Sequence, residues 1–290
     1  EPAAAAAPEE IAHPEPAGTT PTGAKPSLID TAWAFAPEAP RYVISTYRPN
    51  YFLFAHYTSD VNNRPFTPLF DAADVPDQEL DAVEAMFQIS FKTRFWTTDS
   101  HRWGAWLAYT QQSQWQVYNS DISRAFRETN YMPEIFLSYR PDLSLGGFHW
   151  RLFNLGFNHQ SNGRSQVLSR SWNRLFAEFG VERGNFALLA RPWYRISESE
   201  EDDDNPDIVD YMGYGDLTAI YKPGKHSLTF TLRGNIATGK GAAQFTWMSP
   251  PLVGPLRAYV KAFTGYGESM IDYNWKQSSI GLGFALNDVL

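Results

Sequence analysis

Apolar and polar residues alternate along most of the chain from about Tyr51 onward. In the segment 85–96, one set of alternate positions is apolar and the other is mostly polar or charged. The apolar set is Ala85, Phe87, Ile89, Phe91 and Phe95, and the other set contains Gln88, Ser90, Lys92 and Arg94. Since successive side chains of a β-strand point to opposite faces, a period of two residues predicts strands with one apolar and one polar face.

About twelve segments show this alternation, and several of them are ten residues or longer. A strand of a soluble protein usually has about 5 to 6 residues, whereas roughly 9 to 11 tilted residues are needed to cross a bilayer. The expected strands lie near 50–57, 84–96, 103–118, 133–140, 147–161, 169–180, 185–196, 211–222, 226–237, 242–248, 255–264 and 278–290.

The connections between these segments alternate in length. Those after even-numbered strands are short (TTDSHR, RPDLSL, GVERG, KPGK and SPPLVG), whereas most of those after odd-numbered strands are longer or more polar. Short turns on one side and long loops on the other are typical of outer membrane barrels. We therefore predict an all-β fold, a 12-stranded antiparallel transmembrane β-barrel. A soluble sandwich or barrel is the alternative, because alternation alone supports both.

Composition narrows the possible functions. The net charge of -8 and the lack of a basic patch exclude a nucleic-acid partner. The mean hydropathy of -0.39 does not exclude a membrane barrel, which needs only every second residue to be apolar. The chain has no cysteine, so disulfides and thiolate metal sites play no part.

The first part of the chain is rich in Ala, Pro, Glu and Gly and has no periodicity. Such a composition buries too little apolar surface to offset the entropy of an ordered chain. We expect residues 1–40 to be a flexible Ala/Pro-rich N-terminal tail and residues 41–290 to be the barrel. The start EPAAAAAPEE lacks the basic and apolar regions of a signal peptide, which is expected of a mature or processed form.

Three polar residues interrupt the apolar faces of two expected strands. His159 and Ser161 follow Phe153, Leu155 and Phe157 on one face, and Asn173 precedes Leu175, Ala177 and Phe179 on one face of the next strand. An antiparallel pairing that places His159 opposite Asn173 also places Phe157 opposite Leu175 and Phe153 opposite Phe179. This register keeps both apolar rows on one side, as a half-buried sheet requires.

These residue types suggest nucleophilic catalysis at the outer wall of the barrel. Ser161 would be the nucleophile, His159 the general base and Asn173 the residue that orients the base. A neutral amide suits the third position, because an ionised Asp facing lipid would carry a desolvation cost. The ester beside such a wall is phospholipid. Alternatively, His159 and Ser161 belong to an interfacial girdle that contacts lipid head groups.

Several motifs give the chain a resemblance to the outer membrane phospholipase A family, from about Thr98 to the C-terminus. They are FNHQSNGRS at 157–165, SRSWNR at 169–174, YTQ at 109–111, FRETNY at 126–131, DNPD at 204–207, YMGY at 211–214, and GYGES with IDYN within 265–274. The resemblance implies a calcium-dependent phospholipase A1/A2 in the outer membrane of a Gram-negative bacterium, which hydrolyses acyl esters of phospholipids and lysophospholipids from the outer leaflet. It also implies a homodimer as the active state and a monomer as the inactive one.

The same resemblance assigns further residues. The Gly163 amide would be a donor in the oxyanion hole, and Ca2+ would be bound by the carbonyl of Arg164, the hydroxyl of Ser169 and, from a second subunit, Ser123. Where the family often has Asp after NGRS, this chain has Gln166, so a secondary calcium site in the monomer is in doubt. The acidic run 198–204 could bind calcium, but it lacks the spacing of an EF-hand, and we expect it to be a solvated extracellular loop.

Gln111 lies on an apolar strand face, between Tyr109 and Trp115. A lone amide in hydrocarbon is costly unless it has a partner, and a second Gln111 across a two-fold axis would supply one. We therefore expect Gln111 at a dimer interface, with a position near the membrane surface as the alternative. The competing function for the whole chain is a passive barrel, either a narrow channel or a structural anchor.

Overall fold

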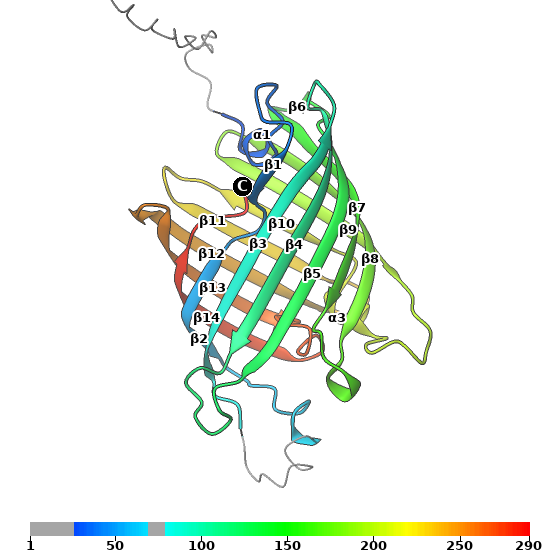
Figure 1. Ribbon diagram of the computed structural model, residues 1–290, viewed down its shortest axis with the longest axis vertical. Coiled ribbons are helices and arrows are strands. Elements are labelled where there is room, and N and C mark those ends of the chain that lie inside the picture. The colour runs from blue at the N-terminus through cyan, green and yellow to red at the C-terminus, as the bar shows by residue number, and fades with distance from the viewer. Residues whose placement is uncertain (1–25, 69–78) are drawn as a thin grey trace, which may run out of the picture.

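The computed structural model describes residues 26–68 and 79–290, and these form a barrel of strongly tilted strands (Figure 1). Its long strands, in chain order, are β2 (Tyr51–Thr58), β3 (Val83–Thr97), β4 (Trp103–Trp115), β5 (Phe126–Tyr139), β7 (Phe148–Ser161), β8 (Ser171–Arg183), β9 (Phe186–Ile196), β10 (Gly215–Tyr221), β11 (Ser227–Asn235), β12 (Lys240–Val253), β13 (Leu256–Tyr266) and β14 (Lys276–Ala285).

Each of these strands pairs antiparallel with its neighbours, and β14 pairs with β2, which closes the ring. Two short strands extend it: β1 (Val43–Thr46) pairs with β3, and β6 (Leu143–Leu145) pairs with β7. The predicted 12-stranded antiparallel barrel is confirmed. Closure matters because it leaves no row of unpaired backbone groups at an edge.

Several strand bounds differ from the predicted ones, including the starts of β5 and β10 and the end of β14. β5 begins at Phe126 instead of near 133. The alternation does not reveal this start, because polar residues occupy both faces of the first part of the strand. Arg127 there pairs with Glu84 and Asp272 inside the barrel. β10 begins at Gly215 because residues 208–212 form the helix α3 (Ile208–Met212). β14 ends at Ala285, and Lys222 beyond β10 pairs with Asp288 at 2.9 Å.

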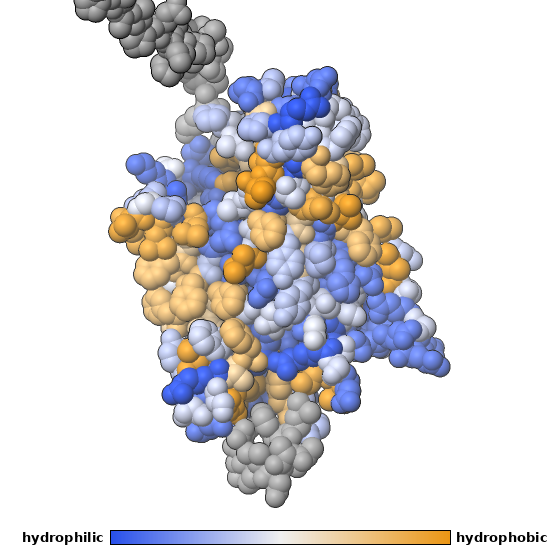
Figure 2. All heavy atoms as spheres, viewed as in Figure 1, coloured by the Kyte–Doolittle hydropathy of each residue, from blue (hydrophilic) through white to orange (hydrophobic). Residues whose placement is uncertain are grey.

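The two faces of the wall differ as the alternation predicts. Figure 2 shows apolar side chains gathered on both flanks of the barrel and hydrophilic ones at its two ends. Among the outward apolar residues are Ile89, Leu107, Ile135 and Leu175, each about half exposed. An apolar belt bounded by polar ends is what a bilayer requires of a barrel surface.

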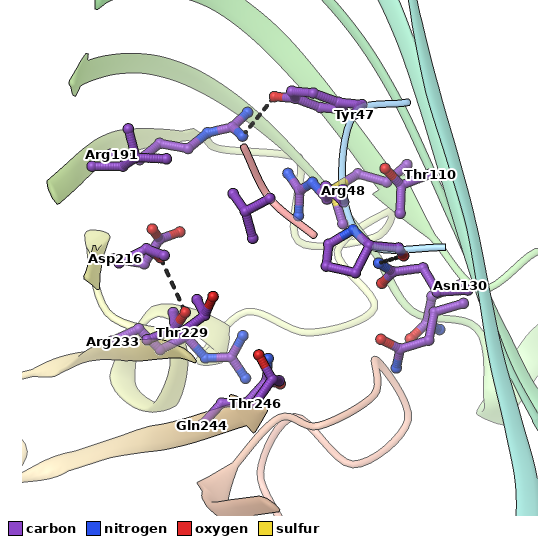
Figure 3. Close-up of a pocket in the computed structure, with 18 of the residues that line it drawn as sticks. Tyr47, Arg48, Thr110, Asn130, Arg191, Asp216, Thr229, Arg233, Gln244 and Thr246 are labelled. Atoms are coloured by element: carbon purple, nitrogen blue, oxygen red, sulfur yellow. Dashed lines mark hydrogen bonds between the residues drawn. The ribbon is translucent and has the colours of Figure 1, made fainter. Parts of the chain in front are cut away.

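The lumen is polar, and several of its charged side chains form ion pairs. Lys261 contacts Glu268 at 2.5 Å, and the Arg191 guanidinium pairs with the carboxylate of Glu134 and donates to the Tyr47 hydroxyl at 3.2 Å (Figure 3). A cavity of about 270 Å³ remains inside the barrel, between residues such as Asp216 and Arg233. Since a buried charge is costly unless it is paired, these ion pairs lower the cost of a charged interior.

A short helix, α1 (Leu28–Trp33), lies at the end of the barrel where β6 and the short turns are found (Figure 1). Its N-terminus is capped by Ser27, whose side chain accepts a hydrogen bond from the Asp30 amide. Ile29 and Trp33 are buried in the main core cluster, and Arg140 donates to the Asp30 carboxylate at 2.7 and 2.8 Å. No helix in the described ranges is long and apolar enough to span a membrane.

The predicted flexible tail of residues 1–40 is therefore wrong for its last part. Residues 1–25 lie outside the described residues, but α1 is ordered by contacts with the barrel. Two buried apolar side chains and one ion pair supply the stabilisation that the composition of the segment did not suggest.

The packing of Trp33 gives a test of this helix. The ring makes edge contacts with Trp106 and Phe136, with centroids 5.6 Å apart in both cases, and the Lys92 ammonium lies 3.4 Å from its centroid. We expect Trp33→Ala to lower the free energy of unfolding by about 3 kcal/mol or more, because a large cavity would remain. Denaturant unfolding in detergent micelles would measure this, with the exposed Tyr42→Ala as the control. Equal stability of Trp33→Ala and the parent would contradict the packing described for α1.

Candidate functional site

The pairing of β7 with β8 brings the three polar residues of the outer wall together. His159 lies opposite Asn173 and Ser161 lies opposite Ser171. Phe157 pairs with Leu175 and Phe153 pairs with Phe179, so the predicted register is found over the whole length of the apolar rows. Register is specified this strongly because a slip by one residue would turn every apolar side chain of the strand inward.

All three residues belong to the outward face. They share alternate positions with Leu155 and Leu175, which are 55% and 49% exposed. The intervening positions point into the lumen and are buried; they include Asn158, Gln160, Trp172 and Arg174. The site therefore lies on the opposite side of the barrel wall from the internal cavity of Figure 3.

His159 and Asn173 are joined by a hydrogen bond of 2.9 Å between Nδ1 and Oδ1. The Asn173 Nδ2 donates in turn to Glu198 Oε1 at 2.8 Å. A carboxylate can only accept, so the amide nitrogen must face Glu198 and the amide oxygen must face the imidazole. Nδ1 of His159 consequently carries the proton, and Nε2 is left as the basic nitrogen in the neutral ring.

Ser161 lies two residues along β7 from His159, on the same face. Residues so related are roughly 6.6 Å apart at Cα, a separation that an imidazole ring can span. No hydrogen bond joins the Ser161 hydroxyl to His159 in this structure. Catalytic hydrogen bonds are often long before substrate is bound, so the arrangement is compatible with a nucleophile and its base.

The turn after Ser161 is held in place by a buried asparagine. Asn162 accepts hydrogen bonds from the amides of Arg164 and Arg170 at 3.3 and 3.0 Å. Its Nδ2 donates to the Leu168 carbonyl at 2.8 Å, and its own amide donates to the Arg170 carbonyl at 3.0 Å. One side chain therefore determines the shape of the loop 162–170, which includes the short helix η1 (Gln166–Leu168).

Gly163 has a left-handed backbone conformation in this loop, with φ of 63°. A Cβ there would lie 2.9 Å from Cε2 of Tyr131, so both the backbone angle and the space favour glycine. Gly163 is an exposed residue, and its N–H makes no hydrogen bond within the described residues. Residues 163–168 line a cavity of about 340 Å³ beside it.

The residues expected to bind metal lie in two loops. Arg164 and Ser169 are both in the loop 162–170, where the Ser169 hydroxyl donates to Asp204 Oδ2 at 2.6 Å. Ser123 lies in the connection between β4 and β5, is exposed, and has a positive φ of 58°. No hydrogen bond joins Ser123 to Ser169 within the described chain.

Gln111 lies outward on β4, but its amide is not alone. The Tyr109 hydroxyl donates to its Oε1 at 3.0 Å, and its Nε2 donates to the Ser113 hydroxyl at 3.3 Å. Gln111 is opposite Tyr131, which is opposite Ser161, so one cross-strand row joins it to the site. The amide therefore has partners within its own strand, and each of its polar atoms can still form a further hydrogen bond. The expected place of Gln111 at a dimer interface stays a prediction.

Two acidic residues of the site were missed in the sequence, because the run 198–204 was interpreted as a solvated loop. Glu198 contacts Asn173 and Asp204 contacts Ser169. Glu198 could have been found, since it continues the outward positions of β9 two residues beyond Ile196, and Ile196 lies opposite Asn173. No periodicity marks Asp204, whose one signal in the sequence is its place as the first residue of the DNPD motif at 204–207.

The loop 267–275 packs nearby through Tyr273. The Arg170 guanidinium lies 5.7 Å from the centroid of its ring, and its hydroxyl donates to Asp207 at 2.6 Å. Burial raises the pKa of the Tyr273 phenol above its ordinary value, and the neighbouring Asp207 raises it further. The phenol therefore stays protonated and keeps its role as donor, which links this loop to the start of α3.

Comparison with known proteins places this geometry in a family. The family model for phospholipase A1 matches residues 33–286. A phospholipase A1 from Klebsiella pneumoniae is 39% identical over 251 residues, which are 86% of this chain and 84% of that protein. A phospholipase A1 from Escherichia coli K12 is 38% identical over 251 residues, which are 86% of this chain and 83% of that protein.

Two solved structures are similar along most of the barrel. The outer membrane phospholipase A of Escherichia coli superposes with a TM-score of 0.78 at 36% identity, covering 86% of this chain and all of that one (100%). The outer membrane phospholipase of Salmonella typhi, a dimer with bound calcium, gives a TM-score of 0.78 at 36% identity, covering 86% of this chain and 94% of that one. With its closed barrel and its sequence, this chain belongs to the phospholipase A1 family, the outer membrane phospholipases.

Proposed function

We propose that this phospholipase is calcium-dependent, acts through Ser161, His159 and Asn173, and hydrolyses acyl esters of phospholipids and lysophospholipids in the outer leaflet as a dimer. The observation that carries the proposal is the 2.9 Å hydrogen bond between His159 Nδ1 and Asn173 Oδ1 on the outward face, beside Ser161. Because Asn173 orients His159 through Nδ1, the other ring nitrogen, Nε2, is free to accept a proton from a nucleophile such as Ser161.

In the first step, His159 Nε2 takes the proton of the Ser161 hydroxyl as Oγ attacks the ester carbonyl. The imidazolium that forms is stabilised by Asn173 Oδ1, which accepts from Nδ1–H. Collapse of the tetrahedral intermediate breaks the bond to the glycerol oxygen, and His159 returns the proton to that leaving group. Water, activated by the same base, then hydrolyses the acyl-serine.

The negative charge of the intermediate requires a donor, and the free N–H of Gly163 is available two residues from the nucleophile. The oxygens around Ser169 fit calcium, since the hydroxyl already contacts the Asp204 carboxylate and the loop 163–168 encloses a cavity. Arg164, Ser169 and, from a second subunit, Ser123 would hold the ion with Asp204 nearby. Calcium would supply positive charge for the developing oxyanion.

The surroundings of the site suit a lipid substrate. Apolar side chains lie toward the middle of the barrel on the same face, and polar loops lie beyond Ser161. An ester lies at the boundary between the acyl chains and the head groups of a lipid, so it would contact both the apolar side chains and the polar loops. We assign the end of the barrel with the longer loops to the outside of the cell, because long loops are extracellular in such barrels.

The Salmonella typhi relative is a dimer, which supports a dimer of this chain, and the expected interface residue Gln111 assigns that interface to the β4 face. Gln111, in the same row as Tyr131 and Ser161, can form further hydrogen bonds with its counterpart across a two-fold axis. A second subunit placed there would contribute Ser123 and would bound a cleft for the acyl chain. The monomer would then lack part of its calcium site and be inactive.

The nucleophile is tested by Ser161→Ala, which should lower fatty-acid release from detergent micelles on the order of a thousandfold or more. A serine-directed sulfonyl fluoride should label Ser161 in the parent chain. Ser171→Ala is the matched control, because Ser171 is the cross-strand neighbour on the same face, and this variant should keep activity and labelling. Full activity of Ser161→Ala would exclude the mechanism and favour a passive barrel.

Calcium dependence is tested with Ser169→Ala and Asp204→Asn. Each should raise the calcium concentration for half-maximal activity about tenfold or more, because groups that orient metal ligands contribute that much to affinity. A chelator should abolish activity, and added calcium should restore it. Glu201→Gln, an exposed change in the same loop, should leave the calcium titration unchanged. An identical titration for the parent and Asp204→Asn would contradict the site.

The dimer is tested with Gln111→Leu. Loss of polar contacts across the interface should weaken dimerisation by about 1 kcal/mol, or roughly fivefold in the dissociation constant. Chemical crosslinking in micelles would measure the fraction of dimer, and activity would be measured at the same protein concentrations. The dimer fraction and the activity should fall together. Thr264→Val is the control, since Thr264 is an exposed polar residue on β13, away from β4 in the ring. Undiminished activity of a strictly monomeric sample would contradict the proposal.

A further inference from the structure

Glu198 is connected to the general base through one side chain. Its Oε1 accepts from Asn173 Nδ2 at 2.8 Å, and Asn173 Oδ1 accepts from His159 Nδ1 at 2.9 Å. Every donor and acceptor in this series has a single possible role, because the carboxylate only accepts and the amide has a distinct donor and acceptor end. The three residues come from β7, β8 and the loop after β9.

The position of Glu198 is determined by the strand before it and the loop after it. β9 ends at Ile196, opposite Asn173, so Glu198 is the next outward position beyond the sheet. The loop is held by the Arg195 guanidinium, which contacts both oxygens of Asp203 at 2.6 and 2.7 Å. Asn205 Oδ1 also accepts from the Ser171 amide at 2.9 Å. These contacts keep Glu198 against Asn173.

A carboxylate at this position solves an electrostatic problem of a site that faces lipid. A negative charge nearby would stabilise the imidazolium formed during catalysis further, but an ionised residue directly on the apolar face would carry a desolvation cost. Glu198 is only partly buried and lies in the loop beyond the end of β9, past the apolar rows of the wall. The neutral amide of Asn173 separates the anion from the apolar face and transmits its polarisation to His159.

We propose that Glu198 is a positioning residue of the reaction: it fixes the orientation of the Asn173 amide and, by polarising it, stabilises the imidazolium form of His159. This inference rests on the proposed Ser161, His159 and Asn173 mechanism. Glu198 does not touch the substrate or the reacting atoms, and it acts through Asn173 alone.

Other titratable groups surround His159, and they have different partners. Tyr131 on β5 is opposite Ser161, Tyr194 on β9 is opposite Leu175, and Asp204 contacts Ser169. Arg195 and Asp203 are paired with each other. In the described part of the chain, Glu198 is the anion that a series of hydrogen bonds connects to His159.

The variant Glu198→Gln tests the charge, since the glutamine oxygen can still accept from Asn173. In calcium-saturated dimers, kcat should fall about threefold to tenfold with KM unchanged, because a partly exposed, charge-assisted hydrogen bond is replaced by a neutral one. The acid limb of the kcat profile should move to lower pH, because loss of the anion disfavours the imidazolium. Sulfonyl fluoride labelling of Ser161 should slow by a similar factor. Glu198→Asp should restore part of the rate.

The matched control is Glu200→Gln, which removes the same charge from an exposed position of the same loop and should behave as the parent. A second control uses the Asn173→Ala background. If Glu198 acts through Asn173, Glu198→Gln should have no further effect there, as is expected of two residues that act as one unit.

Three results would overturn the inference. The first is an unchanged kcat and pH profile for Glu198→Gln. The second is a loss of rate from Glu198→Gln that is as large on the Asn173→Ala background as in the parent. The third is an effect of Glu198→Gln on the calcium titration alone. The last would place Glu198 at the metal instead. Failure of the mechanism itself has a separate signature, since Ser161→Ala would then remain active whatever Glu198 does.

Discussion

The structure depends on one constraint, which is that backbone N–H and C=O groups in a bilayer must find their partners within the protein. The ring from β2 to β14, closed by the pairing of Ala285 with Tyr51, satisfies this requirement without a free edge. Closure also separates two surfaces by strict alternation along every strand. Apolar side chains can then face lipid while charged ones fill the lumen.

This separation makes polar residues on the outer face unusual and informative. Each such residue needs a partner, because lipid offers none. His159 is paired with Asn173, and Gln111 contacts Tyr109 and Ser113. The same requirement that makes these groups costly also holds them in defined orientations, and catalysis needs that precision.

Charge is kept away from the belt in two directions. The ion pairs of Lys261 with Glu268 and of Arg127 with Glu84 lie in the lumen, and Glu198 and Asp204 lie in the loop after β9. The outer wall between them carries neutral groups at the site. The proposed reaction nevertheless passes through charged states, so the acidic loop and the proposed calcium ligands are best placed at the edge of the belt, where water lowers the cost of ionisation.

Alternation by itself determined the strands, the sidedness of His159, Ser161 and Asn173, and the register that joins β7 to β8. These features could be predicted because a period of two residues is a local property, and because a slip by one residue would reverse the faces. The tertiary structure decided the packing of Trp33 in the lumen and the contacts of Glu198 and Asp204 with the site. The contact of Ser169 with Asp204 joins residues 35 positions apart, and Asp204 lies in a loop without periodicity, so only the folded chain brings these two together.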